Sequence, residues 1–316
     1  MTECHRSQFG EMHTKITKGF KKYHIFGFTG TPILADNASS GGNHQIKTTE
    51  QAFGKRLHIY TIVNAINDKN VLPFRIDYVN TFKMRDEVQD EKVRAIDVEK
   101  AASSPERIAK VTDYIIEHFD QKTKRKAQAD SYLFNRLTNI TEIATDKERN
   151  IDKKIKETRS STRLNGFNSI FAVSSIQMAK KYYSEFKSKN SSLKIATIFS
   201  FAANEAEPDE DFNTSGLDKS SRDFLDIAIA DYNSYFGTSY NTSSDKFENY
   251  YKDLSQRMKN REVDLLIVVN MFLTGFDATT LNTLWVDKNL RHHGLLQAFS
   301  RTNRILNSVK TFGNII

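Results

Sequence analysis

The chain has 316 residues, enough for two domains of ordinary size that each bury a hydrophobic core. Its single cysteine, Cys4, excludes a disulfide framework, and no signal peptide or apolar stretch of membrane-spanning length is visible, so a cytoplasmic protein is expected. Lysine and arginine number 46 against 39 aspartates and glutamates, a net charge of +7, which leaves a polyanionic partner and a plain solubility effect equally open.

The first part of the chain alternates apolar runs with helical patterns. Residues 23–33 form a β-rich run that ends in the turn Thr-Gly-Thr-Pro. Residues 58–66 suit a helix or a strand–helix junction, and residues 71–82 predict another strand.

The character changes to charged and helix-favouring sequence between about residues 83 and 163. Ile108, Ile115 and Phe119 recur at helical spacing, with Ser104 and Pro105 as the N-terminal cap. Residues 144–163 are nearly all polar and predict an exposed helix or a mobile connector, whose basic residues form a solvated face more often than a binding patch.

After Gly166 strands and helices alternate again, which predicts a parallel sheet covered on both faces. The predicted strands are residues 168–176, 194–201, 263–272, 283–288 and 310–316, and the helices between them cover residues 178–186, 224–235, 247–258 and 292–304. Both ends of the chain look cut within structured sequence, so we expect a piece of a longer polypeptide.

The chemistry-bearing pattern that stands out is HHGLLQAFSRTNR, residues 292–304. On a helix, Gln297, Arg301 and Arg304 would project from one side, and two guanidinium groups with an amide suit a triphosphate. Taken alone, the pattern favours an exposed helix with two unrelated arginines.

Two turns add to this pattern. Thr274, Gly275 and Asp277 follow a buried strand, where open α/β sheets place their ligands, and Gly275 would let the backbone approach one closely. Residues 29–31, Thr-Gly-Thr, also follow a predicted strand.

The N-terminal stretch MTECHRSQFG reads as the tail of a Walker-B-type box, with Glu3 and His5 in place. Thr2 stands where a metal-binding aspartate is expected, and its neutral hydroxyl is a poor magnesium ligand. No complete metal site is therefore predicted, and Glu3 is a partial one.

Four stretches together carry a resemblance to a known family: ECHRSQFG, FGFTGTPI, VVNMFLTGFD and LLQAFSRTNR. They resemble motifs II, III, V and VI of superfamily 2 helicases and translocases, and more closely the motor (R) subunit of type I restriction enzymes. The resemblance implies an α/β fold with two RecA-like parallel-sheet domains and flanking helices, the first truncated at its N-terminus. Residues 1–85 would be the C-terminal part of the first domain, residues 86–163 a charged, largely helical connector, and residues 164–316 the second domain.

The resemblance also implies roles for individual residues. Catalytic roles fall to Glu3, His5, Arg301 and Arg304, the two arginines stabilising the transferring phosphate. Nucleotide contacts fall to Gly275, Asp277 and Gln297, and DNA contact or coupling to Thr29, Gly30, Thr31, Ser174, Ser175 and Thr274.

The family's activity is ATP- and Mg²⁺-dependent translocation along double-stranded DNA before cleavage, with methylase and specificity subunits as partners. No phosphate loop of the form G-x-x-x-x-G-K-[ST] occurs in this chain, so we expect the chain alone not to hydrolyse ATP. Two alternatives remain open at this point: another superfamily 2 DNA or RNA helicase, and a non-catalytic DNA-binding module that retains motor motifs.

Overall fold

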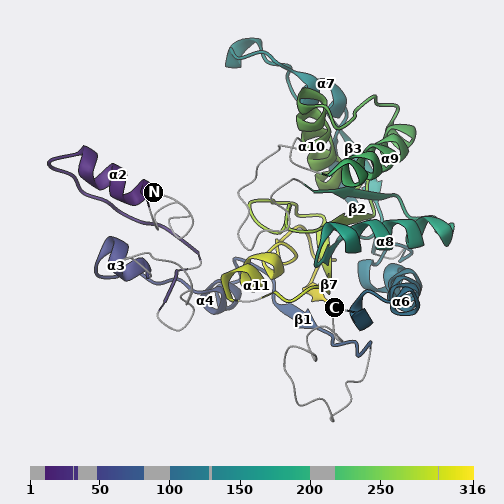
Figure 1. The fold of residues 1–316 in the computed structure, drawn as a ribbon, viewed down its shortest axis with the longest axis horizontal. Coiled ribbons are helices and arrows are strands. Elements are labelled where there is room, and N and C mark those ends of the chain that lie inside the picture. The colour runs from purple at the N-terminus through teal and green to yellow at the C-terminus, as the bar shows by residue number, and fades with distance from the viewer. Residues whose placement is uncertain are drawn as a thin grey trace.

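The computed structural model describes residues 11–30, 32–34, 48–81, 100–127, 130–199, 218–290 and 292–316. Its centre is a six-stranded sheet in which all neighbouring strands run parallel (Figure 1). In the order of the sheet, the strands are β1 (Phe74–Ile76), β8 (Gly313–Ile315), β7 (Leu281–Asp287), β4 (Asn168–Val173), β6 (Leu265–Val268) and β5 (Ile195–Ile198).

The central strands are covered on both faces. Every residue of β4, β5 and β6 is buried, as expected for a parallel sheet whose connecting helices lie on its faces. The predicted α/β fold with a parallel sheet and flanking helices is therefore confirmed.

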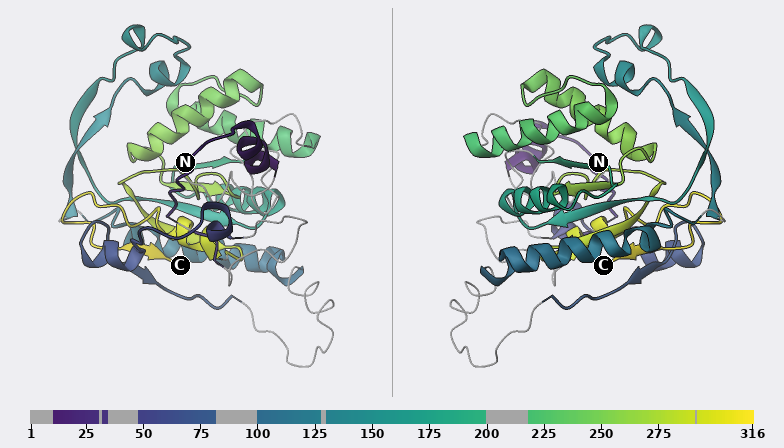
Figure 2. Two further views of the ribbon diagram at one scale, coloured as in Figure 1. Left: turned by 90° about the vertical axis from the view of Figure 1, so that its left-hand side faces the viewer. Right: turned by 90° about the vertical axis from the view of Figure 1, so that its right-hand side faces the viewer.

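Helices flank the sheet and extend beyond it. They are α2 (Glu11–Gly19), α3 (Thr49–Phe53), α4 (Ile62–Asn67), α6 (Pro105–Thr123), α7 (Ile140–Thr145), α8 (Ile176–Ser188), α9 (Lys219–Phe236), α10 (Ser244–Lys259) and α11 (His292–Phe299). Figure 2 shows α6 and α8 side by side, and α6 also packs on β7 while α9 packs on β5. We call the sheet with α6, α8, α9, α10 and α11 the sheet body.

Helix α6 begins where the sequence predicts. Ser104 accepts a hydrogen bond from the Arg107 N–H at 3.4 Å, and Pro105 occupies the first turn, where its missing N–H costs nothing. Ile108, Ile115 and Phe119 are buried in the main hydrophobic core, so the predicted helical spacing is confirmed.

An arm of residues 130–164 leaves the sheet body between α6 and β4. It contains β2 (Tyr132–Leu137) and β3 (Arg159–Leu164), paired antiparallel, with α7 and the short 3₁₀ helix η3 (Ile151–Lys153) between them. The prediction of a helix or mobile connector over residues 144–163 is wrong for residues 159–163, because each of them has a partner residue in β2. The predicted exposure holds from Lys147 to Ser161.

The predicted strand over residues 23–33 is also wrong in the part of it that the structure describes. Residues 23–30, 32 and 33 form no strand beyond a single bridge at Phe28, because a run with β propensity becomes a strand only beside a paired neighbour. No helix in the described part of the chain is long and apolar enough to cross a membrane.

Two elements outside residues 164–316 belong to the sheet body. Strand β1 pairs with β8 in parallel register, and α6 contributes buried side chains to the main core. The sheet body therefore includes elements that precede residue 164, the predicted start of the second domain: β1 from the predicted first domain and α6 from the predicted connector. The assignment of residues 1–85 to a separate domain stays a prediction.

Candidate functional site

A cavity of about 280 Å³ lies where the segment around α4 meets the sheet body. It brings together five residues that the sequence singles out: Gly30, Thr274, Gly275, Gln297 and Arg301. The rest of its lining is Tyr60, Thr61, Ile62, Ala65, Leu296 and Ser300. Residues more than 240 positions apart in the sequence thus meet at one site.

The loop of residues 270–277 supplies one wall of the cavity and leaves the carboxyl end of β6. Two of its residues, Phe272 and Gly275, have left-handed backbone angles, with φ of 67° and 70°. Such a φ is strained for a side chain that bears a Cβ, so glycine is the residue that fits at position 275. The ring centroids of Phe272 and Phe276 lie 4.6 Å apart, and this packing fixes the loop on the core.

Arg301 is held by two carbonyl groups from different elements. Its Nη1 donates to the Phe276 carbonyl oxygen at 2.5 Å, and its Nε donates to the Gln297 carbonyl oxygen at 3.1 Å. These contacts orient the guanidinium group between α11 and the loop of residues 270–277, in the cavity lining.

The predicted helix over residues 292–304 is too long. Helix α11 ends at Phe299, whose carbonyl oxygen accepts both the N–H and the hydroxyl of Thr302. Arg301 and Arg304 therefore follow the helix, and the predicted helical row of Gln297, Arg301 and Arg304 is wrong beyond its first member.

Arg304 meets the other end of the loop. Its Nε lies 3.1 Å from Asp277 Oδ1, without the alignment of a hydrogen bond, and the two side chains are 41% and 61% exposed. Neither residue lines the cavity, so the structure leaves these two predicted site residues outside its lining.

The half-buried Lys288 and the buried Lys310 support the same region. Lys288, just after β7, donates to the Val269 carbonyl oxygen at 2.7 Å and to Asn270 Oδ1 at 2.5 Å, and burial lowers its pKa to about 8. Lys310 donates to the carbonyl oxygens of Thr279 and Leu281, and burial lowers its pKa to about 7. Both lysines tie down backbone on either side of the loop of residues 270–277.

The remaining predicted residues lie elsewhere or outside the described chain. Ser175 caps α8 by accepting the Met178 N–H at 3.2 Å, and the neighbouring Ser174 is exposed. Neither serine lines the cavity, and the half-buried Thr29 precedes its Gly30. Thr2, Glu3, His5 and Thr31 lie outside the described residues.

Sequence reasoning missed Tyr60, Thr61 and Ser300. Thr61 caps α4 in a reciprocal pair with Asn64, a signal readable as a threonine followed three residues later by an amide. Tyr60 donates to Asp68 Oδ2 at 2.8 Å and accepts from Asn70 at 2.7 Å, which no local pattern predicts.

The cavity lining is rich in hydrogen-bond donors and holds no acidic side chain. One guanidinium group, an amide and the hydroxyls of Thr61, Thr274 and Ser300 suit an anionic ligand such as a phosphate ester. Among the described residues, no group of three histidine, cysteine, aspartate or glutamate side chains could hold a metal ion.

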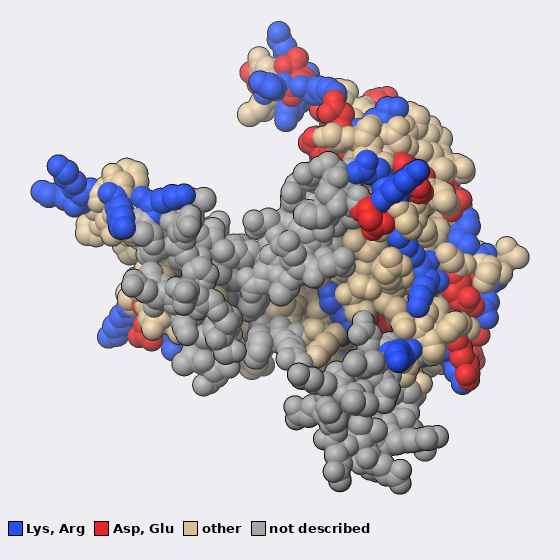
Figure 3. All heavy atoms as spheres, viewed as in Figure 1, with Lys and Arg blue, Asp and Glu red and all other residues tan. Residues whose placement is uncertain are grey.

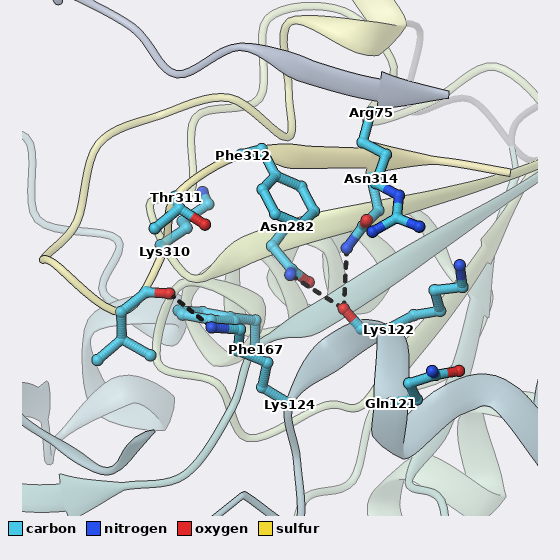
Figure 4. A pocket seen from close by; sticks show the side chains of 11 residues that line it. Arg75, Gln121, Lys122, Lys124, Phe167, Asn282, Lys310, Thr311, Phe312 and Asn314 are labelled. Atoms are coloured by element: carbon cyan, nitrogen blue, oxygen red, sulfur yellow. Dashed lines mark hydrogen bonds between the residues drawn. The ribbon is translucent and has the colours of Figure 1, made fainter. Parts of the chain in front are cut away.

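A second, smaller cavity of about 90 Å³ lies at the amino edge of the sheet and is also basic (Figure 4). Its cations surround the C-terminal end of α6, where free carbonyl groups favour positive charge. Lys124 donates to the Val309 carbonyl oxygen, while the Lys122 carbonyl oxygen accepts from the amides of Asn282 and Asn314. Lys122 also pairs with Asp77, so these charges secure the end of α6.

Two family models match the two parts of the chain that meet at the cavity of about 280 Å³. Residues 165–316 match the family model "Type I restriction enzyme subunit R domain 3", and residues 1–107 match the model "SWI2/SNF2 ATPase".

Relatives match along nearly the whole chain. The type I restriction enzyme SauCOLORF180P endonuclease subunit of Staphylococcus aureus (strain COL) is 39% identical over 99% of this chain and 30% of its own length. The SsaAORF53P subunit of Staphylococcus saprophyticus is 37% identical over the same shares. A solved structure of the Type ISP enzyme LlaBIII bound to DNA aligns with a TM-score of 0.38 and 14% identity, over 100% of this chain and 17% of that one.

Proposed function

Because the chain belongs to the family of type I restriction enzyme endonuclease subunits, we propose that it forms part of the motor of such a subunit. The chain spans about 30% of the length of these relatives, so the activity of the whole protein is part of this proposal. That activity is ATP-dependent translocation along duplex DNA before cleavage, with the nuclease chemistry carried elsewhere.

The observation that carries the proposal is the cavity at Arg301. A nucleotide there would direct its phosphates toward Arg301 and Gln297, with Gly275 allowing close approach of the backbone. Bound ATP would supply the phosphoryl group, and the held guanidinium of Arg301 would stabilise negative charge that develops on it. Arg304, outside the cavity lining and paired with Asp277, is the second candidate for that role.

The remaining assignments belong to the same proposal. Glu3 would polarise the attacking water as a partial metal site, and His5 would couple the nucleotide state to motion. Contact with DNA or coupling to it would fall to Thr29, Gly30, Thr31, Thr274, Ser174 and Ser175. The chain would divide at residues 85 and 163 into motor, connector and motor, with β1 and α6 packed on the last part. Methylase and specificity subunits would be its partners, in the cytoplasm.

The test is DNA-stimulated ATP hydrolysis by a complete subunit that carries this chain. Arg301→Ala is expected to lower the turnover rate by about 10³-fold or more, the range for an arginine that stabilises transferring phosphate. Lys187→Gln, which removes an exposed cation from α8, is the matched control and leaves the rate unchanged.

An Arg301→Ala subunit that keeps the wild-type turnover would overturn the role of the cavity. The isolated chain gives a second test, since it holds no phosphate loop and is expected to hydrolyse no ATP. Measurable hydrolysis by the isolated chain that Arg304→Ala abolishes would contradict this expectation.

A further inference from the structure

The arm of residues 130–164 has no role in the proposed motor cycle, yet it is held firmly. The Leu137 backbone exchanges two hydrogen bonds with the Asn260 side chain at the end of α10, at 3.0 and 2.7 Å. Thr141 in α7 donates to the buried Asp253 at 3.1 Å. Figure 2 shows the arm along one flank of the sheet body, rising to α7. It therefore presents its outer side in a fixed position.

The register of β2 and β3 sorts polar groups onto that outer side. Leu133 faces Arg163 and Asn135 faces Ser161, and all four side chains are exposed. Arg163 donates to Ser131 at 2.8 Å, which holds its guanidinium along the strand. Alternate residues point to the same face, so arginine, serine and asparagine side chains line one exposed surface together with Leu133, which is 71% exposed.

The tip of the arm, the segment between α7 and β3, adds positive charge. Residues 144–163 hold seven lysines and arginines against four acids. Three of the acids are engaged within the arm: Asp146 accepts the N–H groups of Glu148 and Ile155, Glu148 accepts the Asn150 N–H, and Glu157 pairs with Arg159. The backbone contacts, chiefly that from Ile155, hold the pKa of Asp146 below its usual range.

Four cations of the tip lack such a partner. Arg149, Lys153, Lys154 and Lys156 are exposed, and none has a carboxylate within 4.0 Å among the described residues. Figure 3 shows Lys and Arg atoms on this projecting tip, with acidic atoms interspersed among them. Self-repulsion of unpaired charge is a cost that a polyanion would remove.

We propose that the arm is a contact surface for the phosphate backbone of duplex DNA, with Arg149, Lys153, Lys154 and Lys156 at its tip and Arg163 on its strand. This inference rests on the proposed function, since it names the surface by which the motor would hold its track. Phosphates are bound by Arg, Lys, Ser and Asn side chains without regard to sequence, which matches the groups on the outer side. A protein partner would instead favour a buried aromatic centre, which this surface lacks.

The test measures binding of the chain to a fluorescent duplex at several salt concentrations. Lys153→Gln, Lys154→Gln and Lys156→Gln together are expected to weaken binding at low salt and to reduce the slope of log K against log salt by about 2 to 3. Lys180→Gln, Lys181→Gln and Lys187→Gln on α8 form the matched control and should change neither quantity. A slope unchanged in the tip variant, or no binding by the wild-type chain, would overturn the inference.

The complete subunit separates this inference from the proposed function. There the tip variant should raise the DNA concentration for half-maximal ATPase several-fold and leave the maximal rate unchanged. Wild-type ATPase with an unchanged DNA requirement in the variant would remove the inference and leave the proposed function standing. Tip-dependent DNA binding by a subunit that shows no DNA-stimulated ATPase would overturn the proposed function and leave the inference standing. Loss of assembly with the other subunits, with DNA binding intact, would assign the arm to a protein partner and also overturn the inference.

Discussion

The sheet body and the N-terminal segment, residues 11–67 where described, both contain many apolar residues but bury them differently. Strand β4 is buried at every position, whereas α3 and α4 contain no buried residue. The large exposed apolar side chains of the N-terminal segment are Phe20, Tyr23, Phe26, Phe28, Leu34, Leu57, Ile59, Tyr60 and Val63. The difference shows that apolar sequence forms a core only where neighbouring elements close around it. The candidate site lies at the junction of these two regions.

The largest expected effect is a difference in the unfolding free energy lost when a phenylalanine is truncated in each of the two regions. Phe171→Ala empties a position that is 1% exposed between α8 and the sheet, and is expected to cost about 3–5 kcal/mol of unfolding free energy. Phe28→Ala removes the same ring from a position that is 64% exposed, and should cost less than about 1 kcal/mol. Urea denaturation measures both values, and equal losses would break the comparison.

A second substitution tests how the chain after β1 is tied to the body. The Arg107 guanidinium forms a bidentate pair with Asp287 at the carboxyl end of β7, and it also donates to Thr81. Because both partners of the ion pair are largely buried, Arg107→Met leaves the Asp287 carboxylate without its cation, with only the Tyr182 hydroxyl donating to it, and should cost about 3 kcal/mol. Lys110→Met, whose pair with Glu106 is exposed, should cost at most about 1 kcal/mol. Equal costs would mean that the buried ion pair contributes no more to the unfolding free energy than the exposed one.

The pH dependence of stability tests the burial of Lys310. Its pKa is about 7 in the folded chain, against about 10.4 for an unfolded lysine. Between these values the unfolded chain binds one more proton, so this lysine makes stability rise with pH by up to about 1.4 kcal/mol per unit. The unfolding free energy of wild type relative to Lys310→Met should therefore increase from pH 7 to pH 9. A difference that stays constant over this range would place Lys310 in water.

The smallest expected effect concerns the junction. Asp277→Asn removes a partner of Arg304, but both side chains are substantially exposed, so the unfolding free energy should change by less than about 1 kcal/mol. Thermal or urea denaturation measures the change. A loss above about 2 kcal/mol would make this pair part of the fold, and its candidate role toward a ligand would lose support.

The sheet body was largely predictable from the sequence because its strands are continuous apolar runs. The apolar runs within residues 263–272 and 168–176 form the buried strands β6 and β4, although both strands are shorter than predicted, and Ser104 with Pro105 marked the start of α6. The end of α11 was not predictable, since Thr302 closes it through hydrogen bonds that a helical pattern of spacing does not reveal. Strand β3 is polar and owes its form to pairing with β2, which is a long-range contact.

The candidate site was predictable in part for the same reason. Gly275, Gln297 and Arg301 belong to recognisable turns and helix ends, and the structure brings them to one cavity. Tyr60 and Ser300 carry no local signal, because their place in the lining follows only from how the N-terminal segment meets the sheet body. The contact of Arg301 with the Phe276 carbonyl likewise depends on a loop conformation that the residue types alone do not specify.

The central claim is that a nucleotide occupies the cavity at this junction. Hydrogen–deuterium exchange of the complete subunit, with and without a non-hydrolysable ATP analogue, tests it most directly. The account predicts that the analogue slows exchange at residues 61–65, 273–276 and 297–301. It predicts no change in the exchange rate at the amino-edge cavity around Lys122 and Asn314. Protection confined to the amino edge, or no protection at the three predicted stretches, would contradict it.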